Sequence, residues 1–209
     1  GRTVQRDHTG IPKRERVVRV LVACEFSSTV RSAFEKAGHE AWSCDILPTE
    51  GDPRFHIQGD VGEVLGEGWD LMVAHPPCTH LASSGARWFK DKVVEQKTAV
   101  DFVRQLLEAD IPMIALENPV GVLSTKVRKP DQIIQPWEYG HPESKRTCLW
   151  LKRLPPLRPT NVLTPTRHDG RWENQTPSGQ NRLGPSADRW KLRSLTYQGI
   201  ADAMANQWG

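Results

Sequence analysis

Short, nearly continuous apolar runs alternate in the first half of the chain with segments whose apolar residues have helical spacing. Residues 17–24 are rich in valine and almost entirely apolar, and residues 69–75 and 111–118 have the same apolar character. Runs of this kind are typical of strands that are buried on both faces of a sheet. Residues 40–46 and 55–60 predict two further strands, of which the second is short.

Helical periodicity characterises the segments between and after these runs. Ser27 or Ser28 is suited to cap a helix that runs to Lys36. Residues 93–110 carry apolar side chains at helical spacing, and residues 194–208 predict a closing helix. Strands that alternate with helices predict an α/β fold with a doubly wound, mostly parallel sheet. The carboxyl ends of its strands then form one edge, where ligands bind.

Polar and irregular segments divide the rest of the chain. Residues 1–16 predict a polar N-terminal arm, and residues 17–209 predict a single domain. After residue 118 the pattern weakens, although residues 148–152 predict one more strand. Residues 155–193 are rich in proline, glycine, arginine, asparagine and serine. A loop of this length is uncommon inside a domain and is usually functional or disordered.

Composition narrows the class of protein only slightly. The chain has 28 Lys and Arg against 25 Asp and Glu, a net charge of +3, which is weak support for an anionic partner. No apolar run is long enough to cross a bilayer, and residues 1–16 contain no apolar leader segment. The four cysteines form no C-x-x-C pair and no disulfide framework. We therefore expect a reduced, cytoplasmic protein without a membrane partner, and a monomer.

Reactive or acidic side chains follow most of the predicted strands. Each has an ordinary structural explanation, because an aspartate after a strand is usually a turn former and a buried cysteine is usually a small apolar residue. Their shared position at one edge of one sheet is what indicates a functional site. The side chains concerned are Cys24, Glu25, Asp45, Asp60, Cys78 and Glu117.

Cys78 follows two prolines in the sequence HPPCTH. Pro76 and Pro77 fix φ and disfavour helical backbone, which predicts a rigid, extended exit from the strand that presents the thiol at the sheet edge. A simple strand-terminating turn explains the motif equally well. His75, Cys78 and His80 do not have a standard zinc spacing, so no metal is predicted. His80 is also too close in sequence for a typical Cys–His hydrolase dyad.

Glu117 ends a strand that is predicted to be buried. A carboxylate there is costly unless it is paired or used. Beside a cleft its pKa would be raised, which suits it to donate a proton or to bind a ring nitrogen. The structural alternative is a salt bridge of Glu117, with Asn118 as a helix N-cap.

The order of these motifs resembles the catalytic core of the cytosine-C5 DNA methyltransferases. HPPC at residues 75–78 resembles their Pro-Cys nucleophile motif, and ENP at residues 117–119 resembles their Glu-Asn-Val motif. The resemblance covers most of residues 17–155 and 194–209. Three further segments resemble the strand that ends in an acid, the arginine-containing strand and the closing helix of the family: residues 34–46, 140–151 and 197–208.

The resemblance implies a Rossmann-like methyltransferase domain over residues 17–209 that transfers a methyl group from S-adenosylmethionine to C5 of cytosine in DNA. Cys78 would add to C6, Glu117 would bind N3 and the exocyclic amine, and Arg146 would contact the base near O2. Asp45 would bind the ribose hydroxyls of the cofactor, and Asp60 would lie near the adenine amine. The other cofactor-binding residues implied are Ala23, Glu25, Phe26, Ser27, Ser28, Ile46, Val61 and Pro77.

Three departures from the family pattern stand in this sequence. The first loop, ACEFSSTV, contains no glycine, although the family's loop is rich in it. Lys145 and Arg146 are adjacent, whereas the family spaces two arginines one residue apart. The closing helix has QGIAD where the family has a Gly-Asn pair, so no catalytic role is carried over to it.

The largest departure is the absence of a substantial recognition domain. Between the arginine-containing strand and the closing helix, only residues 155–193 are available in its place. This loop can be a minimal element that binds the phosphate backbone of duplex or single-stranded DNA, with Trp172 or Trp190 stacking on a base. Alternatively, the substrate is a cytosine nucleotide or a single strand, or the loop is a solvated excursion. A nucleic-acid-binding protein without turnover is a further alternative. The predicted DNA-binding residues are Arg167, Arg171, Arg182, Arg189 and Lys191.

Overall fold

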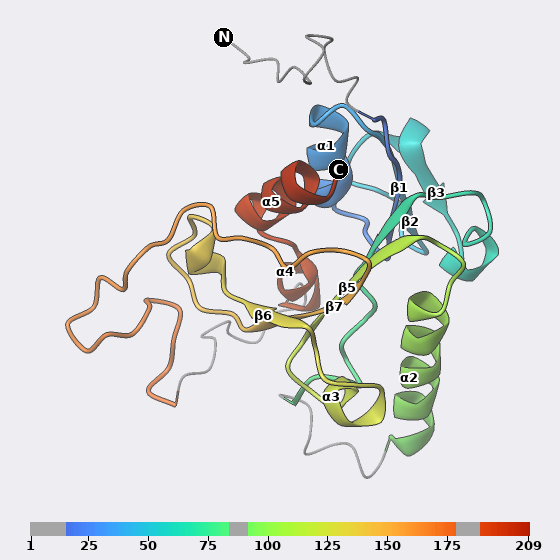
Figure 1. The fold of residues 1–209 in the computed structure, drawn as a ribbon. Helices are drawn as coiled ribbons and strands as arrows, with labels where there is room; N and C mark the ends of the chain where they lie inside the picture. Colours follow the sequence, from blue (N-terminus) through green and yellow to red (C-terminus); the bar gives the residue numbers. More distant parts are fainter. Residues whose placement is uncertain (1–15, 84–91, 179–188) are drawn as a thin grey trace, which may run out of the picture.

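The computed structural model describes residues 16–83, 92–178 and 189–209. In this part of the chain, seven strands form one sheet in the order β3-β2-β1-β4-β5-β7-β6 (Figure 1). The strands are β1 (Arg19–Ala23), β2 (Glu40–Asp45), β3 (His56–Gln58), β4 (Leu71–Ala74), β5 (Met113–Pro119), β6 (Gln132–Ile134) and β7 (Thr147–Lys152). The strands β1 to β5 pair in parallel, whereas β7 is antiparallel to both β5 and β6.

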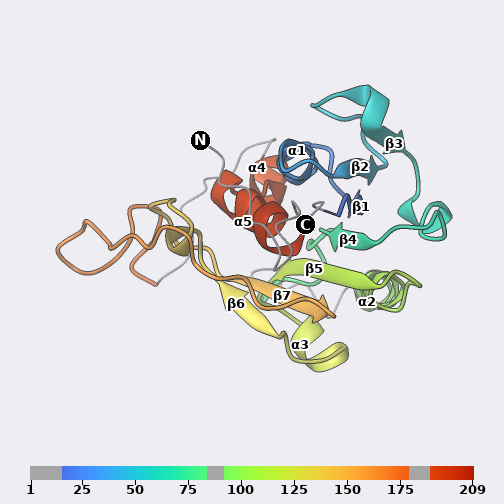
Figure 2. The same cartoon turned by 45° about the horizontal axis from the view of Figure 1, so that its top comes forward.

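Helices cover both faces of the sheet. Figure 2 shows α1 and α5 on one side and α2 and α3 on the other. The helices are α1 (Thr29–Lys36), α2 (Val93–Leu107), α3 (Leu123–Lys126), α4 (Arg189–Ser194) and α5 (Gln198–Trp208), with short 3₁₀ turns η1 (Pro53–Phe55), η2 (Val61–Glu63) and η4 (Pro136–Glu138). Among the described helices, none has the length and apolar character needed to cross a bilayer.

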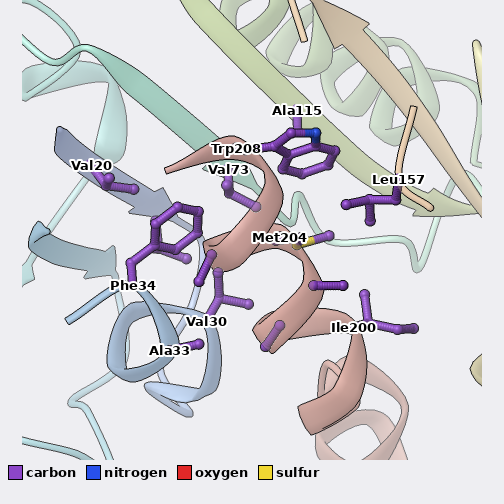
Figure 3. Packing of buried hydrophobic residues seen from close by; sticks show 14 of the residues in the cluster. Val20, Val30, Ala33, Phe34, Val73, Ala115, Leu157, Ile200, Met204 and Trp208 are labelled. Atoms are coloured by element: carbon purple, nitrogen blue, oxygen red, sulfur yellow. The ribbon is translucent and has the colours of Figure 1, made fainter. Parts of the chain in front are cut away.

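The central strand β1 shows why both faces need a helical layer. Val20 and Val22 belong to the hydrophobic cluster that includes α1 and α5, whereas Leu21 and Ala23 belong to the cluster that includes α2. All four side chains are fully buried, as expected of alternating residues in a strand covered on both sides. Figure 3 shows the first cluster, with Phe34 of α1 and residues of α5 packed against the sheet.

The predicted fold class, a Rossmann-like α/β fold with a doubly wound and mostly parallel sheet, is confirmed by this topology. The direction of strand addition reverses between β1 and β4, which are neighbours in the sheet. In folds of this kind, the reversal leaves a crevice at the carboxyl ends of the two strands, and ligands bind there. The predicted site edge is therefore formed by the residues that follow β1, β4 and β5.

The second half of the chain departs from the sequence prediction in detail. The predicted closing helix over residues 194–208 is wrong at its start, since α4 ends at Ser194 and α5 begins at Gln198. Strand β6 and helix α3 were not predicted, because both are too short to give a periodic signal. The first fifteen residues of the predicted polar arm lie outside the described residues.

Residues 155–178 of the predicted long loop contain no helix and no strand of more than a single bridge. Trp172 is nevertheless buried, and its ring stacks on that of Trp137 with the centroids 6.1 Å apart. The prediction that Trp172 stacks on a base is therefore wrong in this conformation, because the ring is already used to fasten the loop to η4. Trp190 lies in α4, and its side chain is outside what the structure describes.

Candidate active site at the carboxyl edge of the sheet

The register of the central strands brings three chemically capable side chains together. Ala23 pairs with Ala74, and Ala74 pairs with Leu116. The next residue on each strand is Cys24, His75 and Glu117, respectively. The amide of His75 also donates to the carbonyl of Ala23 at 2.9 Å, which continues the pairing beyond β4. His75 is therefore fixed between the ends of β1 and β5.

His75 and Glu117 form a largely buried pair. The distance between His75 Nδ1 and Glu117 Oε2 is 3.0 Å, and the side chains are only 7% and 18% exposed. Burial alone would lower the pKa of His75, but the hydrogen bond to Glu117 and the charges of Glu117 and Glu25 outweigh it and raise the pKa. Burial alone would raise the pKa of Glu117, but the hydrogen bond and the charge of His75 outweigh it and lower the pKa.

This pair corrects the prediction that the pKa of Glu117 is raised. No motif identifies a partner for this carboxylate, and burial without a partner does raise a carboxyl pKa. With His75 at hydrogen-bond distance, the ionised carboxylate is favoured instead. Glu117 thus forms the salt bridge that was the structural alternative. A salt bridge at this edge of the sheet is also compatible with a catalytic role.

Asn118 connects the carboxylate strand to the turn that carries the thiol. Its side chain is buried and lies in β5, so the alternative role as a helix N-cap is wrong. Asn118 Nδ2 donates to the carbonyl of Pro76 at 2.9 Å. Together with the bond between His75 and Glu117, this contact holds residues 75–78 against the end of β5.

Cys78 lies at the end of this fastened segment. Residues 75–78 have no regular secondary structure, which agrees with the extended exit that the two prolines predict. The carbonyl of Cys78 accepts hydrogen bonds from the amides of Leu81 and Ala82, both at 3.0 Å, which closes a turn after the cysteine. Its side chain is half-buried. The segment before it and the turn after it thus fix the position of the thiol.

The electrostatic surroundings of Cys78 are mixed. Burial, and then the negative charge of Glu117, raise the pKa of the thiol, while Arg193 and Lys145 act in the opposite direction. The net shift is upward, so the neutral thiol is favoured in the free protein. A role as nucleophile therefore requires that substrate binding reduces the negative charge at Glu117 or provides a base.

Gly121 packs against the turn that follows Cys78. Ala82 bridges to Gly121, and the amide of Val122 donates to the carbonyl of Leu81 at 2.9 Å. A side chain at Gly121 would overlap this same carbonyl oxygen and the adjoining backbone. Only glycine allows the backbone after β5 to approach the turn that follows Cys78 so closely.

We therefore expect Gly121→Ala to displace the turn and to lower the free energy of unfolding by about 1–3 kcal/mol, the usual cost of overpacking. Urea unfolding measures the effect. Gly66→Ala is the control, because a Cβ there would meet nothing within 4 Å. Equal stability of the two variants would show that the backbone contact at Gly121 does not constrain the turn.

The loop after β1 reaches tight geometry without glycine. Cys24 and Ser28 adopt left-handed backbone conformations, with φ of 60° and 64°. The carboxylate of Glu25 accepts hydrogen bonds from the amides of Val30 at 2.9 Å and Arg31 at 3.1 Å. Of the two serines predicted to cap this helix, Ser28 makes no capping bond. The hydroxyl of Ser27 accepts a bond from the amide of Thr29 at 3.4 Å, and Glu25 satisfies the next two amides of α1. No glycine is needed where two L-residues accept left-handed backbone.

A small recess adjoins this loop. It has a volume of about 20 Å³ and is lined by residues 24–27, His75 and residues 194–196. The contribution of residues 194–196 was not predicted, because the chain returns to the site between α4 and α5 and no motif marks that return. Phe26 and Ser28 are buried, and Ser28 bonds to Arg31 Nε at 3.0 Å. Pro77 is exposed.

The end of β2 carries a second pair of predicted cofactor residues. One oxygen of Asp45 accepts from the amide of Leu47 at 2.9 Å, and burial raises the pKa of the Asp45 carboxyl. Ile46 is 75% exposed, which is unusual for a large apolar side chain. Asp60 caps η2 through the amide of Gly62 at 2.8 Å, and Val61 is buried. Asp60 thus forms an ordinary turn. The exposure of Ile46, by contrast, is not explained by packing against other residues.

Of the two adjacent cations, Lys145 rather than Arg146 is the one whose charge affects the site. Its charge acts on both Cys78 and Glu117, and its Nζ donates to the carbonyl of Arg193 at 2.9 Å. Arg146 is exposed and lowers the otherwise raised pKa of Cys148. The base contact predicted for Arg146 stays a prediction, and Lys145 is a cation of the site that the family spacing did not point to.

The cations predicted to bind DNA are mostly paired with carboxylates. Arg167 and Arg171 both bond to Asp169, and Lys191 forms an ion pair with Glu50. Arg189 lies in α4 with its side chain outside what the structure describes, and Arg182 lies outside the described residues. Among the described residues, no group of three or more His, Cys, Asp or Glu side chains is arranged to hold a metal ion.

Comparison with protein-family models and with curated proteins finds no match. Among solved structures, the chain is similar to a protein described as a candidate DNA modification methyltransferase encoded within a prophage of E. coli. The two are 16% identical with a TM-score of 0.47, over 70% of this chain and 52% of the other. The chain thus spans about half the length of that protein.

Proposed function

We propose that the protein transfers a methyl group from S-adenosylmethionine to C5 of cytosine in DNA. One observation carries the proposal. The segment that ends in Cys78 and the strand that carries Glu117 are joined by two side-chain hydrogen bonds, His75 to Glu117 and Asn118 to Pro76. These bonds support the assignment of a nucleophile and an acid to the edge where an α/β sheet binds ligands.

The chain offers suitable groups for the cofactor, which supplies an electrophilic methyl group when bound. Asp45 is a carboxylate at the end of β2 that is suited to the ribose hydroxyls, and the exposed Ile46 is suited to an apolar ring face. The recess at residues 24–27 opens beside His75 and hence beside the catalytic pair. The carboxylate and the exposed apolar side chain after β2 support a cofactor site at this edge, and the recess marks where the chain opens beside His75.

The chemistry assigned to Cys78 and Glu117 follows from the electronic structure of cytosine. Its C5 is unreactive until a nucleophile adds to C6, so Cys78 thiolate forms a bond to C6. The displaced electron pair moves toward N3, which takes up a proton that Glu117 passes to it, so that charge does not build up on the ring. C5 then carries the electron density needed to accept a methyl group. Transfer of the C5 proton to a solvent water and cleavage of the bond between Cys78 and C6 then restore the thiolate.

The charges of the 155–193 segment bear on the substrate. Basic residues of the 155–193 segment would neutralise DNA phosphates. Arg167 and Arg171 are already paired with Asp169, which favours a less charged substrate than extended duplex, such as a single strand or a free cytosine nucleotide. That second candidate keeps the same chemistry and changes only the partner.

Labelled S-adenosylmethionine offered with duplex DNA, single-stranded DNA and dCMP tests the proposal. After digestion, mass analysis locates the methyl group. Label on C5 of cytosine from either DNA is the expected result. Label on dCMP alone would replace the partner and keep the mechanism. Absence of label on all three would favour a nucleic-acid-binding protein without turnover and would overturn the assignment of Cys78.

A separate prediction concerns the cofactor. Asp45→Ala removes a charged hydrogen-bond acceptor, worth about 1.5–3 kcal/mol, so the Kd for S-adenosylmethionine is expected to rise about 10- to 100-fold. Isothermal titration calorimetry measures it. Asp110→Ala is the control, because Asp110 is exposed and lies just before β5 at the opposite edge of the sheet. An unchanged Kd in Asp45→Ala would remove Asp45 from the cofactor site.

A further inference from the structure

His75 has no task in the proposed chemistry, yet it is among the most constrained side chains of the site. Its ring is 7% exposed and its Nδ1 lies 3.0 Å from Glu117 Oε2. Its Nε2 is buried and has no hydrogen-bond partner among the described residues. A buried, half-satisfied imidazole is costly, which indicates a function rather than a packing role.

Charged groups from three elements face this ring. Glu117 comes from β5, Glu25 from the loop after β1, and Lys145 from the segment before β7. Two carboxylates thus oppose one ammonium group. Glu25 is itself fixed by the amides at the start of α1, so its charge cannot turn away. Burial raises the pKa of Glu25 itself, so Glu117, at hydrogen-bond distance, is the main carboxylate that stabilises the imidazolium form of His75.

Glu117 faces the thiol as well as the imidazole. Its negative charge raises the pKa of Cys78. The positive charge of His75 offsets that negative charge at the point where thiolate must form. The proton shared by His75 and Glu117 therefore lies where it can affect both the Cys78 thiol and the base that Glu117 would bind.

We propose that His75 is a positioning residue that stores, behind Glu117, the proton delivered to cytosine N3. The inference rests on the proposed function and assigns the acid of the reaction to a His75–Glu117 pair rather than to Glu117 alone. The family resemblance does not supply it, because it follows from the contact between residues that are 42 positions apart in the chain.

As the bond from Cys78 sulfur to C6 forms, the electron pair displaced toward N3 takes a proton from Glu117, and Glu117 takes the Nδ1 proton of His75. The imidazole is then neutral and Glu117 is a carboxylate. When a solvent water takes the C5 proton and the electron pair of that C–H bond expels Cys78 as thiolate from C6, the proton on N3 returns through Glu117 to His75, and the pair is restored.

The pH dependence of kcat distinguishes the pair from a lone carboxylate. In the wild type the alkaline limb follows loss of the proton from the pair, above the ordinary histidine pKa of about 6.5. In His75→Asn only Glu117 is left to carry the proton. The alkaline limb of kcat is therefore expected to lie about one pH unit or more below that of the wild type, and kcat at pH 8 is expected to be about 100-fold smaller. His80→Asn is the control, since it removes the other histidine of the same segment but leaves the pair intact.

A second measurement does not depend on turnover. In protein labelled with ¹⁵N-histidine, the ring nitrogens of His75 are expected to show the imidazolium form at pH 7, with a titration midpoint above the ordinary value. Glu117→Gln is expected to lower that midpoint, because it removes the nearest negative charge. This measurement on the wild type does not require that His75→Asn folds.

The outcomes separate the two proposals. Methyl transfer by the wild type with superimposable pH profiles for His75→Asn and wild type would overturn the role of His75 and leave the proposed function intact. A neutral His75 at pH 7 would overturn it as well. No methyl transfer by the wild type on any substrate would overturn both. A shifted alkaline limb, together with an imidazolium sensitive to Glu117, is the result that supports the pair.

Discussion

Cys78→Ala is expected to abolish methyl transfer, with a loss of about 10⁴-fold or more, while the Kd for S-adenosylmethionine stays within about threefold. The substitution removes the sulfur atom, which is the only atom proposed to form a bond to the base. Glu117 can still interact with N3, but this interaction alone does not activate C5. The side chain is half-buried, so its loss leaves only a small cavity. Rates with labelled cofactor, and calorimetric binding of unlabelled cofactor, measure the two effects.

Two further variants exclude trivial explanations for that loss. Cys78→Ser keeps the size of the side chain but supplies a much poorer nucleophile, and it is expected to be folded and inactive. Cys148→Ala removes a buried thiol from β7, where it pairs with Asn118 but does not belong to the turn, and is expected to lose some stability but to keep its activity. Retained methyl transfer in Cys78→Ala would show that the thiol only terminates a strand.

Glu117→Gln is the second large effect. The amide keeps the shape of the carboxyl group but cannot carry the proton to N3, so kcat is expected to fall about 10²- to 10⁴-fold. Binding of the cofactor is expected to change little, because the amide keeps a hydrogen bond to His75 and the strand is unaltered. Single-turnover rates on cytosine-containing DNA measure the loss. A variant with nearly wild-type kcat would exclude Glu117 as the acid.

The same variant alters stability in a defined pH range. Because the fold lowers the pKa of Glu117, that carboxylate stabilises the protein above its ordinary pKa of 4.5, and the contribution is lost as the pH falls through the lowered value. Because the fold raises the pKa of His75, the imidazolium stabilises the protein below its ordinary pKa of 6.5, and the contribution is lost as the pH rises through the raised value. Glu117→Gln is thus expected to be most destabilising between those two pH values, as measured by urea unfolding.

The sheet was predictable from the sequence because its central strands are buried on both faces. Residues 17–24 and 69–75 are apolar without alternation, and the structure places strands β1 and β4 inside these ranges. The short edge elements were not predictable in this way. Strand β6 has three residues and depends on its pairing with β7, which no local pattern reveals.

Within the site, motifs identified candidate residues but not the contacts between them. Cys78 and Glu117 stand in recognisable short motifs. The partnership of His75 with Glu117 depends on the register of β4 against β5, which the sequence does not state. The cap provided by Glu25 was missed for a similar reason, because it lies five residues before the first amide that it binds, which is not the usual N-cap spacing.

The central claim is that Cys78 bonds to cytosine during methyl transfer. The most direct measurement uses duplex and single-stranded DNA that contain 5-fluorocytosine, with S-adenosylmethionine. Fluorine at C5 cannot be lost as a proton, so the bond between Cys78 and C6 persists after the methyl group has been transferred. Intact mass and peptide mapping are expected to show a methylated DNA adduct on Cys78 and none in Cys78→Ala. No adduct, or an adduct on another cysteine, would contradict the account.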